Sequence, residues 1–406
     1  MMRHTLAFLS VCALTLSGVV AQTDAVVLEA KVTQVMLGAV DMRQANFWIR
    51  TQDGQDAFTV NLIPKGDTKA QKKSFGPFKA KEADAFIVKV CAGPLEPGTK
   101  YAYEISNIKG TLETPANYRD RTPPPKYTVA LGGGHYDNDP DYDPPFKTPG
   151  SAYHIFESIT HKKPQLMVWL GDATILREGD WGSRSGIFER HKKARATKEL
   201  QGLLSSVPNV AVIGAGETAN GDRFLWNIAD MKDAFERYWA NPSFGVSAAE
   251  GNLATQLRFN DAEFFLLDDR SQRDMRDQFN RSNTYLGKAQ RDWLIEALAR
   301  STATFKIIVS NTSLLNPVQE NNDPVTVPNT REDFLKTLRL RDIKGVFFIS
   351  GNRAAGETTK FVRANGYDLY DFCVGPLTAR AATAPSSMNH LRMPGSTTVG
   401  NQFATL

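Results

Sequence analysis

The segment QLMVWLGDAT, residues 165–174, decides the fold of the larger part of this chain. It is a short, apolar run that ends in Gly171-Asp172, which is typical of a strand covered on both faces and ending at a polar edge. Similar apolar runs recur at 127–131, 210–213, 264–267, 306–309 and 346–349. Helical patterns lie between them, among others at 152–160, 197–204, 231–238 and 288–299. This alternation predicts a layered α/β domain.

Upstream of this region the chain has the pattern of a separate β domain. Short β-branched or aromatic runs of strand length stand at 47–49, 57–60 and 85–88. In LEPGTKYAY, residues 95–103, a Pro-Gly turn precedes Tyr101 and Tyr103, which share one face of the following strand. This resembles the strand entry of fibronectin-type sandwiches, where a tyrosine fastens the corner. An ordinary hairpin is the alternative.

A proline-rich linker separates the two regions. Residues 118–126 contain the run Pro123-Pro124-Pro125, which fits neither a central strand nor a helix interior. We therefore predict a fibronectin- or Ig-like β-sandwich over residues 25–117 and the α/β domain over residues 127–406.

The first residues predict export. A basic start at Arg3, an apolar run at 6–20 and small residues at 19–21 are typical of a signal peptide, which we place at residues 1–21. The mature protein is therefore expected to be secreted or periplasmic. No later apolar run is long enough to predict a transmembrane segment.

Composition narrows the possible partners. The formal net charge of +4 is too small to indicate nucleic acid, so an unknown protein, a glycan or an anionic ligand is expected instead. Cys91 and Cys373 are expected to be separate buried thiols rather than a disulfide. Because the chain stops at Leu406, a closing strand is expected to be missing or supplied by a neighbouring molecule.

Polar residues follow most of the predicted strands. The tails are GGGHYDN (132–138), GDAT (171–174), GAGE (214–217), DDR (268–270) and SGNR (350–353). Because the carboxyl ends of parallel strands meet at one edge of a sheet, these side chains are expected to form a pocket. The alternative is that glycine and aspartate merely terminate the strands.

The order of several motifs resembles the alkaline phosphatase D (PhoD-like) metallophosphoesterase family. They are WLGD (169–172) with LRE (176–178), LDDR (267–270), LGKAQRDWL (286–294), ATFK (303–306), SGNR (350–353), YDLYD (367–371) and GPLT (375–378). The likeness runs from about residue 35 to 403 and implies a metallophosphatase-like fold for the second domain. It also implies a site in which two cations, held by Asp, Asn, His and Cys or Tyr, clamp a phosphate ester and activate a water.

This chain departs from the family at positions where the resemblance implies metal ligands. The replaced positions are Gly134, Ala215, Gly216, Asn352 and Ala354. Gln165 stands where a common Asp precedes the second strand. Asp172, the implied bridging carboxylate, remains, and Tyr136 and Asn138 remain as weak donors.

These losses predict an exported, catalytically inactive PhoD-like homologue, a pseudophosphatase with a binding or structural role. Its vestigial pocket is expected to hold Asp172, Glu217, Arg270, Asn352, Arg353 and Glu357. The alternative is a metal-dependent phosphomono- or diesterase with a reduced site for a single Ca, Fe, Zn or Mn ion. Such an ion could be held by His135, Asp137, Asp172, Glu217 and Glu357. His135 is otherwise expected at the rim of its loop.

Further alternatives stay open at the same strand ends. His135 with Asp172 or Glu217 could act as an acid–base pair without metal. The arginines at 270 and 353 could bind an anion, or could instead form salt bridges to Asp269 and Glu357. The acidic run at 137–143 lacks the glycine and terminal glutamate of a calcium loop and is expected to be a solvated turn.

Overall fold

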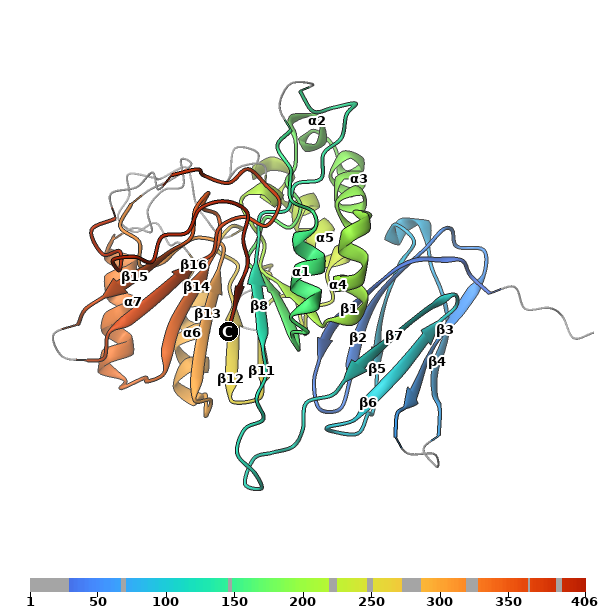
Figure 1. The fold of residues 1–406 in the computed structure, drawn as a ribbon, viewed down its shortest axis with the longest axis horizontal. Coiled ribbons are helices and arrows are strands. Elements are labelled where there is room, and N and C mark those ends of the chain that lie inside the picture. The colour runs from blue at the N-terminus through green and yellow to red at the C-terminus, as the bar shows by residue number, and fades with distance from the viewer. Residues whose placement is uncertain are drawn as a thin grey trace, which may run out of the picture.

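A computed structural model describes residues 29–66, 71–144, 148–218, 225–246, 251–271, 286–318, 328–363, 366–384 and 389–406 (Figure 1). The predicted signal peptide, residues 1–21, lies outside these ranges. No helix within them is both long and apolar enough to cross a membrane.

The N-terminal part consists of two antiparallel sheets with the strand orders β1-β2-β5 and β4-β3-β6-β7. The strands are β1 (Val32–Val40), β2 (Ala45–Thr51), β3 (Ala57–Pro64), β4 (Lys73–Lys79), β5 (Ile87–Ala92), β6 (Lys100–Ile105) and β7 (Ile108–Glu113), with a 3-10 turn at Glu82–Asp84. Both sheets contribute to one apolar core, which includes Phe47 and Phe58. Tyr101 and Tyr103 are buried on the same face of β6, and the Glu96 backbone N–H donates to Tyr101 Oη at 2.9 Å.

The second part has two further sheets, with the orders β10-β9-β8-β17 and β11-β12-β13-β14-β16-β15. The first contains β8 (Val129–Gly132), β9 (Leu166–Trp169), β10 (Asn209–Ala211) and β17 (Ala404–Thr405). The second contains β11 (Thr255–Phe259), β12 (Ala262–Leu266), β13 (Phe305–Ser310), β14 (Val346–Ser350), β15 (Glu357–Phe361) and β16 (Leu369–Cys373). Apolar side chains of both sheets, such as Val168 and Ile307, form the core between them.

Helices cover the outer faces of these two sheets (Figure 1). The helices are α1 (Ile155–His161), α2 (Glu178–Trp181), α3 (Arg184–Arg195), α4 (Gln201–Ser206), α5 (Ile228–Tyr238), α6 (Lys288–Arg300) and α7 (Pro328–Leu340), with 3-10 turns at Lys198–Leu200, Gly216–Thr218 and Leu225–Asn227. Helices α6 and α7 pack on the larger sheet through Leu298 and Leu338. Helices α1, α4 and α5 pack on the smaller one. The predicted layered α/β arrangement is present.

Strand β1 joins the two parts of the chain. Val35 and Leu37 point into the sandwich core, whereas Met36 packs with Phe235 and Trp239 in the core beneath α5. Hydrogen bonds support this contact, from the Ala39 N–H to the Ala240 carbonyl and from Tyr103 Oη to the Ser205 carbonyl. A large apolar interface of this kind fixes how the sandwich sits against the α/β part.

The last strand, at Ala404 and Thr405, pairs with Leu131 and Ala130 of β8 at one edge of the smaller sheet. The expectation that both cysteines are buried is wrong. Both cysteines are free, but only Cys373 is buried and Cys91 is exposed. Cys91 lies on β5 at a position that faces away from the sandwich core, which its residue type does not reveal.

Candidate functional site

Asp172 lies just beyond the carboxyl end of β9, with its backbone in the left-handed region at φ 54°. Its side chain is buried, and Oδ1 accepts a hydrogen bond from the Gly216 backbone N–H at 2.5 Å. The Nδ2 of Asn311 lies 3.3 Å from Oδ2. A non-glycine residue held with positive φ stores backbone strain, which often marks a functional site. Here the side chain of the strained residue, Asp172, makes its hydrogen bonds within the protein.

The loop after β10 closes directly over Asp172. A Cβ on Gly214 would stand 2.1 Å from the Asp172 backbone N and 2.3 Å from its Oδ1. A Cβ on Gly216 would stand 2.8 Å from Ile175 and 3.2 Å from Asp172 Oδ1. Glycine is therefore required at 214, and a larger side chain at 216 needs the loop to move. The backbone of this loop fills the space beside the carboxylate.

Asn311 links the two sheets above their carboxyl ends. Its Nδ2 donates to the Leu170 carbonyl at 2.9 Å, and its Oδ1 accepts from the Ala215 backbone N–H at 3.1 Å. The Nη2 of Arg270 donates to the same Oδ1 at 2.5 Å and to Thr312 Oγ1 at 2.9 Å. The guanidinium is buried, so its charge is matched by protein groups and not by water. We call Asp172, Glu217, Arg270 and Asn311 the Asp172 cluster.

Glu217 is the second acid of this cluster. It is fully buried, and its Oε2 accepts from the Gly214 backbone N–H at 2.7 Å. Burial and the neighbouring Asp172 carboxylate raise the pKa of Glu217 to about 8, while backbone hydrogen bonds and Arg195 act in the opposite direction. Burial also raises the pKa of Asp172, against the hydrogen bond from Gly216 and the charge of Arg270. Glu217 therefore holds its proton at neutral pH.

His135 is not a rim residue and does not face these acids. It is buried, with Nδ1 2.8 Å from Thr378 Oγ1 and Nε2 3.1 Å from the Ala194 carbonyl. Burial lowers the pKa of His135 to about 3, so the ring stays neutral. Its backbone N–H donates to the Asp172 carbonyl at 2.8 Å, but the imidazole makes no hydrogen bond to the side chain of Asp172 or Glu217, so the acid–base pair considered from the sequence is absent.

Tyr136 and Asn138 are also used within their own loop. Tyr136 Oη donates to Asp143 Oδ1 at 2.6 Å, and Asn138 exchanges hydrogen bonds with the Gly150 backbone at 2.7 and 2.8 Å. Neither polar group is directed to Asp172. The two side chains expected to be weak metal donors are therefore occupied elsewhere.

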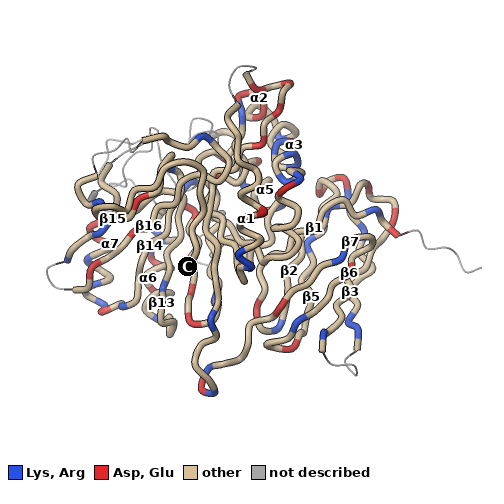
Figure 2. The backbone as a smooth tube through the Cα atoms, in the orientation of Figure 1, with Lys and Arg blue, Asp and Glu red and all other residues tan. Residues whose placement is uncertain are grey.

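The acidic run at 137–143 is solvated only in part, because Asp141 and Tyr142 are exposed whereas other members of the run pair with α3. Asp139 is buried and bonds Lys193 Nζ at 2.6 Å, and Asp137 lies 3.6 Å from Arg190 Nη1. Both basic side chains come from α3, where Lys and Arg gather (Figure 2). The carboxylates thus fasten this loop to α3. The sequence alone did not predict that α3 lies beside these carboxylates.

Glu357 belongs to a second group of charges. Its Oε2 accepts from Arg392 Nε at 2.6 Å, and its Oε1 lies 3.5 Å from Arg353 Nη2 and accepts from Asn389 at 3.3 Å and from Asn316. We call these residues the Glu357 cluster. Both expected salt bridges are present, since Arg270 Nε also lies 3.9 Å from Asp269 Oδ1.

Comparison with known proteins agrees with this architecture. Residues 234–402 match the family model described as PhoD-like phosphatase. A solved structure described as "Structure of PhoD" matches with a TM-score of 0.65 and 17% identity, over 84% of this chain and 76% of that chain. This chain carries a PhoD-like phosphatase domain.

The remaining comparisons add little. A redesigned β-sandwich protein matches with a TM-score of 0.18 and 13% identity, over 22% of this chain and 99% of that one. A β-glucuronidase of an uncultured Clostridium sp. matches with a TM-score of 0.25 and 10% identity, over 87% of this chain and 67% of that one. These scores are too low to indicate a shared fold. No curated protein matches the chain.

The residues of this PhoD-like phosphatase domain and its surroundings do not fit the two cations that the family implies. Within the described ranges, no three His, Cys, Asp or Glu side chains gather so that they could hold a metal ion. The Asp172 carboxylate faces an N–H donor and an amide, and the Arg270 cation lies close by. A Cβ at Gly134 would stand 2.9 Å from Pro376, so a cysteine there would also be crowded.

Of the predicted pocket, the structure brings together only part. Asp172, Glu217 and Arg270 lie in the Asp172 cluster, while Arg353 and Glu357 lie in the Glu357 cluster. Asn352 has a left-handed backbone at φ 55°, and the Gly351 N–H before it donates to the Asn311 carbonyl. Ala354 accepts a backbone hydrogen bond from Ala382 at 2.7 Å.

Asn311 is the central residue that sequence reasoning missed. It lies two residues after the end of the predicted strand at 306–309, so the rule applied to the other strand ends would have found it. Gln165, by contrast, precedes β9 and lies at the opposite end of that strand, so its identity does not affect the Asp172 cluster.

Proposed function

We propose that this chain is an exported, catalytically inactive PhoD-like homologue, a pseudophosphatase with a binding or structural role. The observation that supports it most is the state of Asp172, which stands at the position of the implied bridging carboxylate. Its carboxylate is paired with the Gly216 N–H and Asn311, beside the buried guanidinium of Arg270. Two dications next to that guanidinium would be repelled, and one available carboxylate could not compensate their charge.

The loop geometry supports the same proposal. Gly214 and Gly216 let the backbone close over Asp172, whereas a ligand side chain at either position would meet Asp172 or Ile175. The site therefore differs from a metal site in backbone course as well as in side chains. Restoring single ligand residues is not expected to restore activity.

Metal loading with activity measurement tests the proposal. The protein is incubated with Ca²⁺, Fe²⁺, Zn²⁺ or Mn²⁺, desalted, and its metal content measured by mass spectrometry, beside hydrolysis of p-nitrophenyl phosphate and bis-p-nitrophenyl phosphate. Asp172→Asn is the matched control, because it removes the carboxylate of the implied bridging ligand and keeps the shape of the side chain. We expect no stoichiometric metal and equal background rates for both proteins. One metal ion per chain with turnover, both lost in Asp172→Asn, would overturn the proposal and indicate a single-metal esterase.

Two finer assignments belong to the same proposal. The hydrogen bond from Glu96 to Tyr101 Oη supports a fibronectin-like relationship for the N-terminal sandwich. The signal-peptide pattern of residues 1–21 supports export to the periplasm or the medium. Mass spectrometry of the protein recovered from a secreting host tests the latter, since we expect a mature chain that begins after Ala21.

A further inference from the structure

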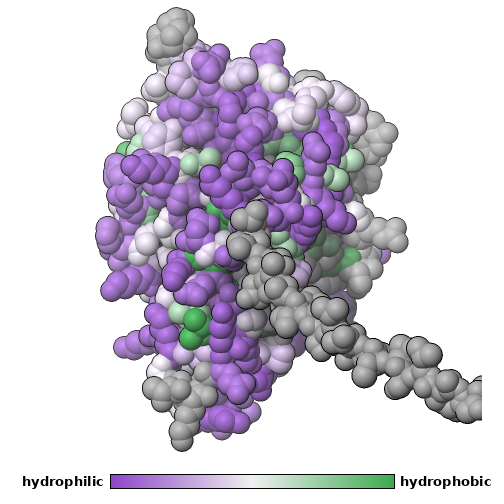
Figure 3. All heavy atoms as spheres, turned by 90° about the vertical axis from the view of Figure 1, so that its right-hand side faces the viewer, coloured by the Kyte–Doolittle hydropathy of each residue, from purple (hydrophilic) through white to green (hydrophobic). Residues whose placement is uncertain are grey.

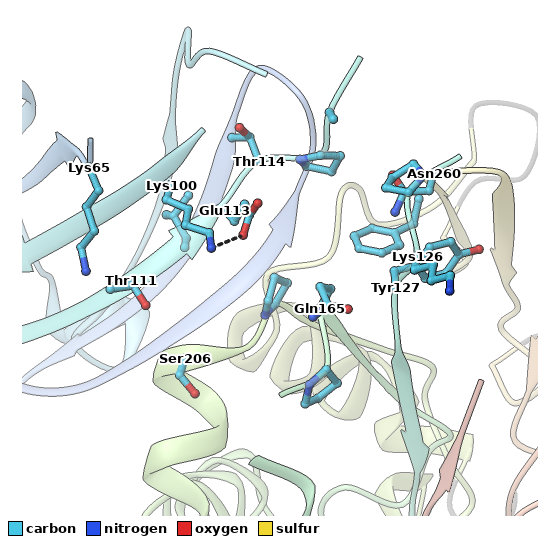
Figure 4. A pocket seen from close by; sticks show the side chains of 17 residues that line it. Lys65, Lys100, Thr111, Glu113, Thr114, Lys126, Tyr127, Gln165, Ser206 and Asn260 are labelled. Atoms are coloured by element: carbon cyan, nitrogen blue, oxygen red, sulfur yellow. Dashed lines mark ion pairs between the residues drawn. The ribbon is translucent and has the colours of Figure 1, made fainter. Parts of the chain in front are cut away.

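The groove between the sandwich and the α/β part is the cavity that stands apart from both charge clusters. It has a volume of about 470 Å³, within the range of ligand sites, and lies at a domain interface, where such sites are common. Tyr127, Gln165 and Pro208 line it and precede β8, β9 and β10. The groove therefore lies at the opposite ends of these strands from Asp172. Figure 4 shows the side chains that line the groove.

The charges of this interdomain groove favour an anion. Lys65, Lys100 and Lys126 line it, against the single acid Glu113, whose carboxylate lies 3.6 Å from Lys100 Nζ. Lys65, Lys100 and Glu113 come from the sandwich side, and Lys126 comes from the facing wall (Figure 4). An anionic ligand between them would meet cations from both sides.

The walls of the groove are rigid and mostly neutral. Four prolines line it, at positions 115, 125, 164 and 208. The Tyr127 ring is fixed by its hydroxyl, which donates to Asp261 Oδ1 at 2.8 Å, and by an edge contact with Phe259. Because β1 anchors the two parts, the groove is formed before a ligand arrives, which lowers the ordering cost of binding.

Hydrogen-bonding groups indicate a ligand that also donates. The hydroxyls of Thr111 and Ser206 and the amide of Asn260 line the groove. Asn260 is buried, and its Oδ1 has no hydrogen-bond partner among the described residues. A buried acceptor without a partner marks a place where a donor is missing.

Other ligand classes fit less well. The lining contains no arginine and no helix N-terminus, the groups that commonly hold phosphate. An extended peptide would need a free strand edge, but α4 packs against β7, the strand that ends at the groove. The end of the sandwich that faces away from the groove is mostly hydrophilic, with scattered apolar residues only (Figure 3).

We propose that the interdomain groove binds a carboxylated glycan, its carboxylates beside Lys65, Lys100 and Lys126 and its hydroxyls on the neutral walls. This inference gives a surface and a ligand class to the binding role in the proposed function. It stands on residues remote from Asp172, so metal-dependent turnover would overturn the inactive phosphatase and leave groove binding intact.

Calorimetric titration of the full chain with tri-galacturonate tests the inference. We expect saturable binding that weakens as the salt concentration rises. Maltotriose, a neutral trisaccharide, should bind at least about tenfold more weakly than tri-galacturonate. The triple variant Lys65→Glu, Lys100→Glu, Lys126→Glu should lose about tenfold or more in affinity. Lys192→Glu, a charge reversal on the distant helix α3, should bind as the wild type does.

Defined outcomes would overturn the inference. They are no binding of tri-galacturonate, equal binding by the triple variant, or equal binding of maltotriose. Tighter binding of hexaglutamate or inorganic phosphate than of tri-galacturonate would overturn it in favour of an acidic peptide or a phosphate site. The titration is repeated with the single variant Lys100→Ala, which changes an exposed side chain and is not expected to disturb the fold.

Discussion

Charged side chains are buried at the carboxyl ends of strands β8 to β10 and exposed at the amino ends of the same strands. At the carboxyl ends, Asp172 and Glu217 are buried beside Arg270, which follows β12 of the other sheet, and their partners are other protein groups. At the amino ends, Lys100 and Glu113 stand in solvent, with 67% and 55% of their side chains exposed. Buried charges must be matched inside the fold, whereas exposed charges remain free to meet a ligand. Changes at the first end should therefore alter stability, and changes at the second should alter binding.

Arg270→Met should give the largest loss of stability. It removes the guanidinium that bonds Asn311 and Thr312 and that lies near the buried carboxylates of Asp172 and Asp269. We expect the free energy of unfolding to fall by about 3–5 kcal/mol, measured by urea denaturation. Arg43→Met, at an exposed ion pair, should change it by no more than about 0.5 kcal/mol. Equal effects at the two positions would remove the distinction between buried and exposed charges.

Gly214→Ala tests the closing of the loop over Asp172. The added Cβ would stand 2.1 Å from the Asp172 backbone N, so the loop must shift and the variant should lose about 1–3 kcal/mol. Gly202→Ala is the matched control, because the helix α4 has nothing within 4 Å of that Cβ. It should stabilise the protein by up to about 1 kcal/mol. An unaffected Gly214→Ala would show that the loop has room for a ligand side chain.

Glu217 should make stability depend on pH. In the folded protein the pKa of its carboxyl is raised to about 8, against 4.5 for an exposed glutamate. Between these two pKa values the folded state binds more protons than the unfolded state, so the free energy of unfolding decreases as the pH rises from one to the other. Glu217→Gln cannot ionise and should exceed the wild type by about 1–3 kcal/mol near pH 9. The two proteins should be similar near pH 4, and parallel pH profiles would contradict the burial of this charge.

Lys100→Ala should have the smallest effect on stability. The side chain is exposed and its ion pair with Glu113 is long, so urea denaturation should show a change within about 0.5 kcal/mol. A loss above about 1.5 kcal/mol would mean that the exposed groove charges contribute to stability, as the buried charges of the Asp172 cluster do.

Much of the architecture follows from apolar patterns. The runs at 165–170, 264–267 and 306–309 are wholly or almost wholly apolar because both faces of their sheets are covered, and each is a strand as predicted. Helix α3 was not predicted, because its buried face includes Arg190, His191 and Arg195. Their burial depends on partners such as Asp137 and the Tyr238 carbonyl, which lie far away in sequence.

The candidate site was predictable at the level of which strand ends carry polar groups. The family resemblance pointed to Asp172, Glu217 and Arg270, and these residues do meet. Their mutual pairing through Asn311 was not predictable, because it depends on how closely the loop at 214–216 approaches β9. The groove could not be predicted from the sequence either, because its walls come from segments that only the packing of the two parts brings together.

The burial of β1 on both faces has a consequence for how the molecule comes apart. Met36 and Trp48 belong to the apolar cluster of α5, so removing the sandwich would expose Phe235 and Trp239 to water. Each part therefore has apolar surface that is covered only by the other part. Heating should therefore give a single calorimetric transition, and a fragment that starts at the proline-rich linker should aggregate instead of refolding.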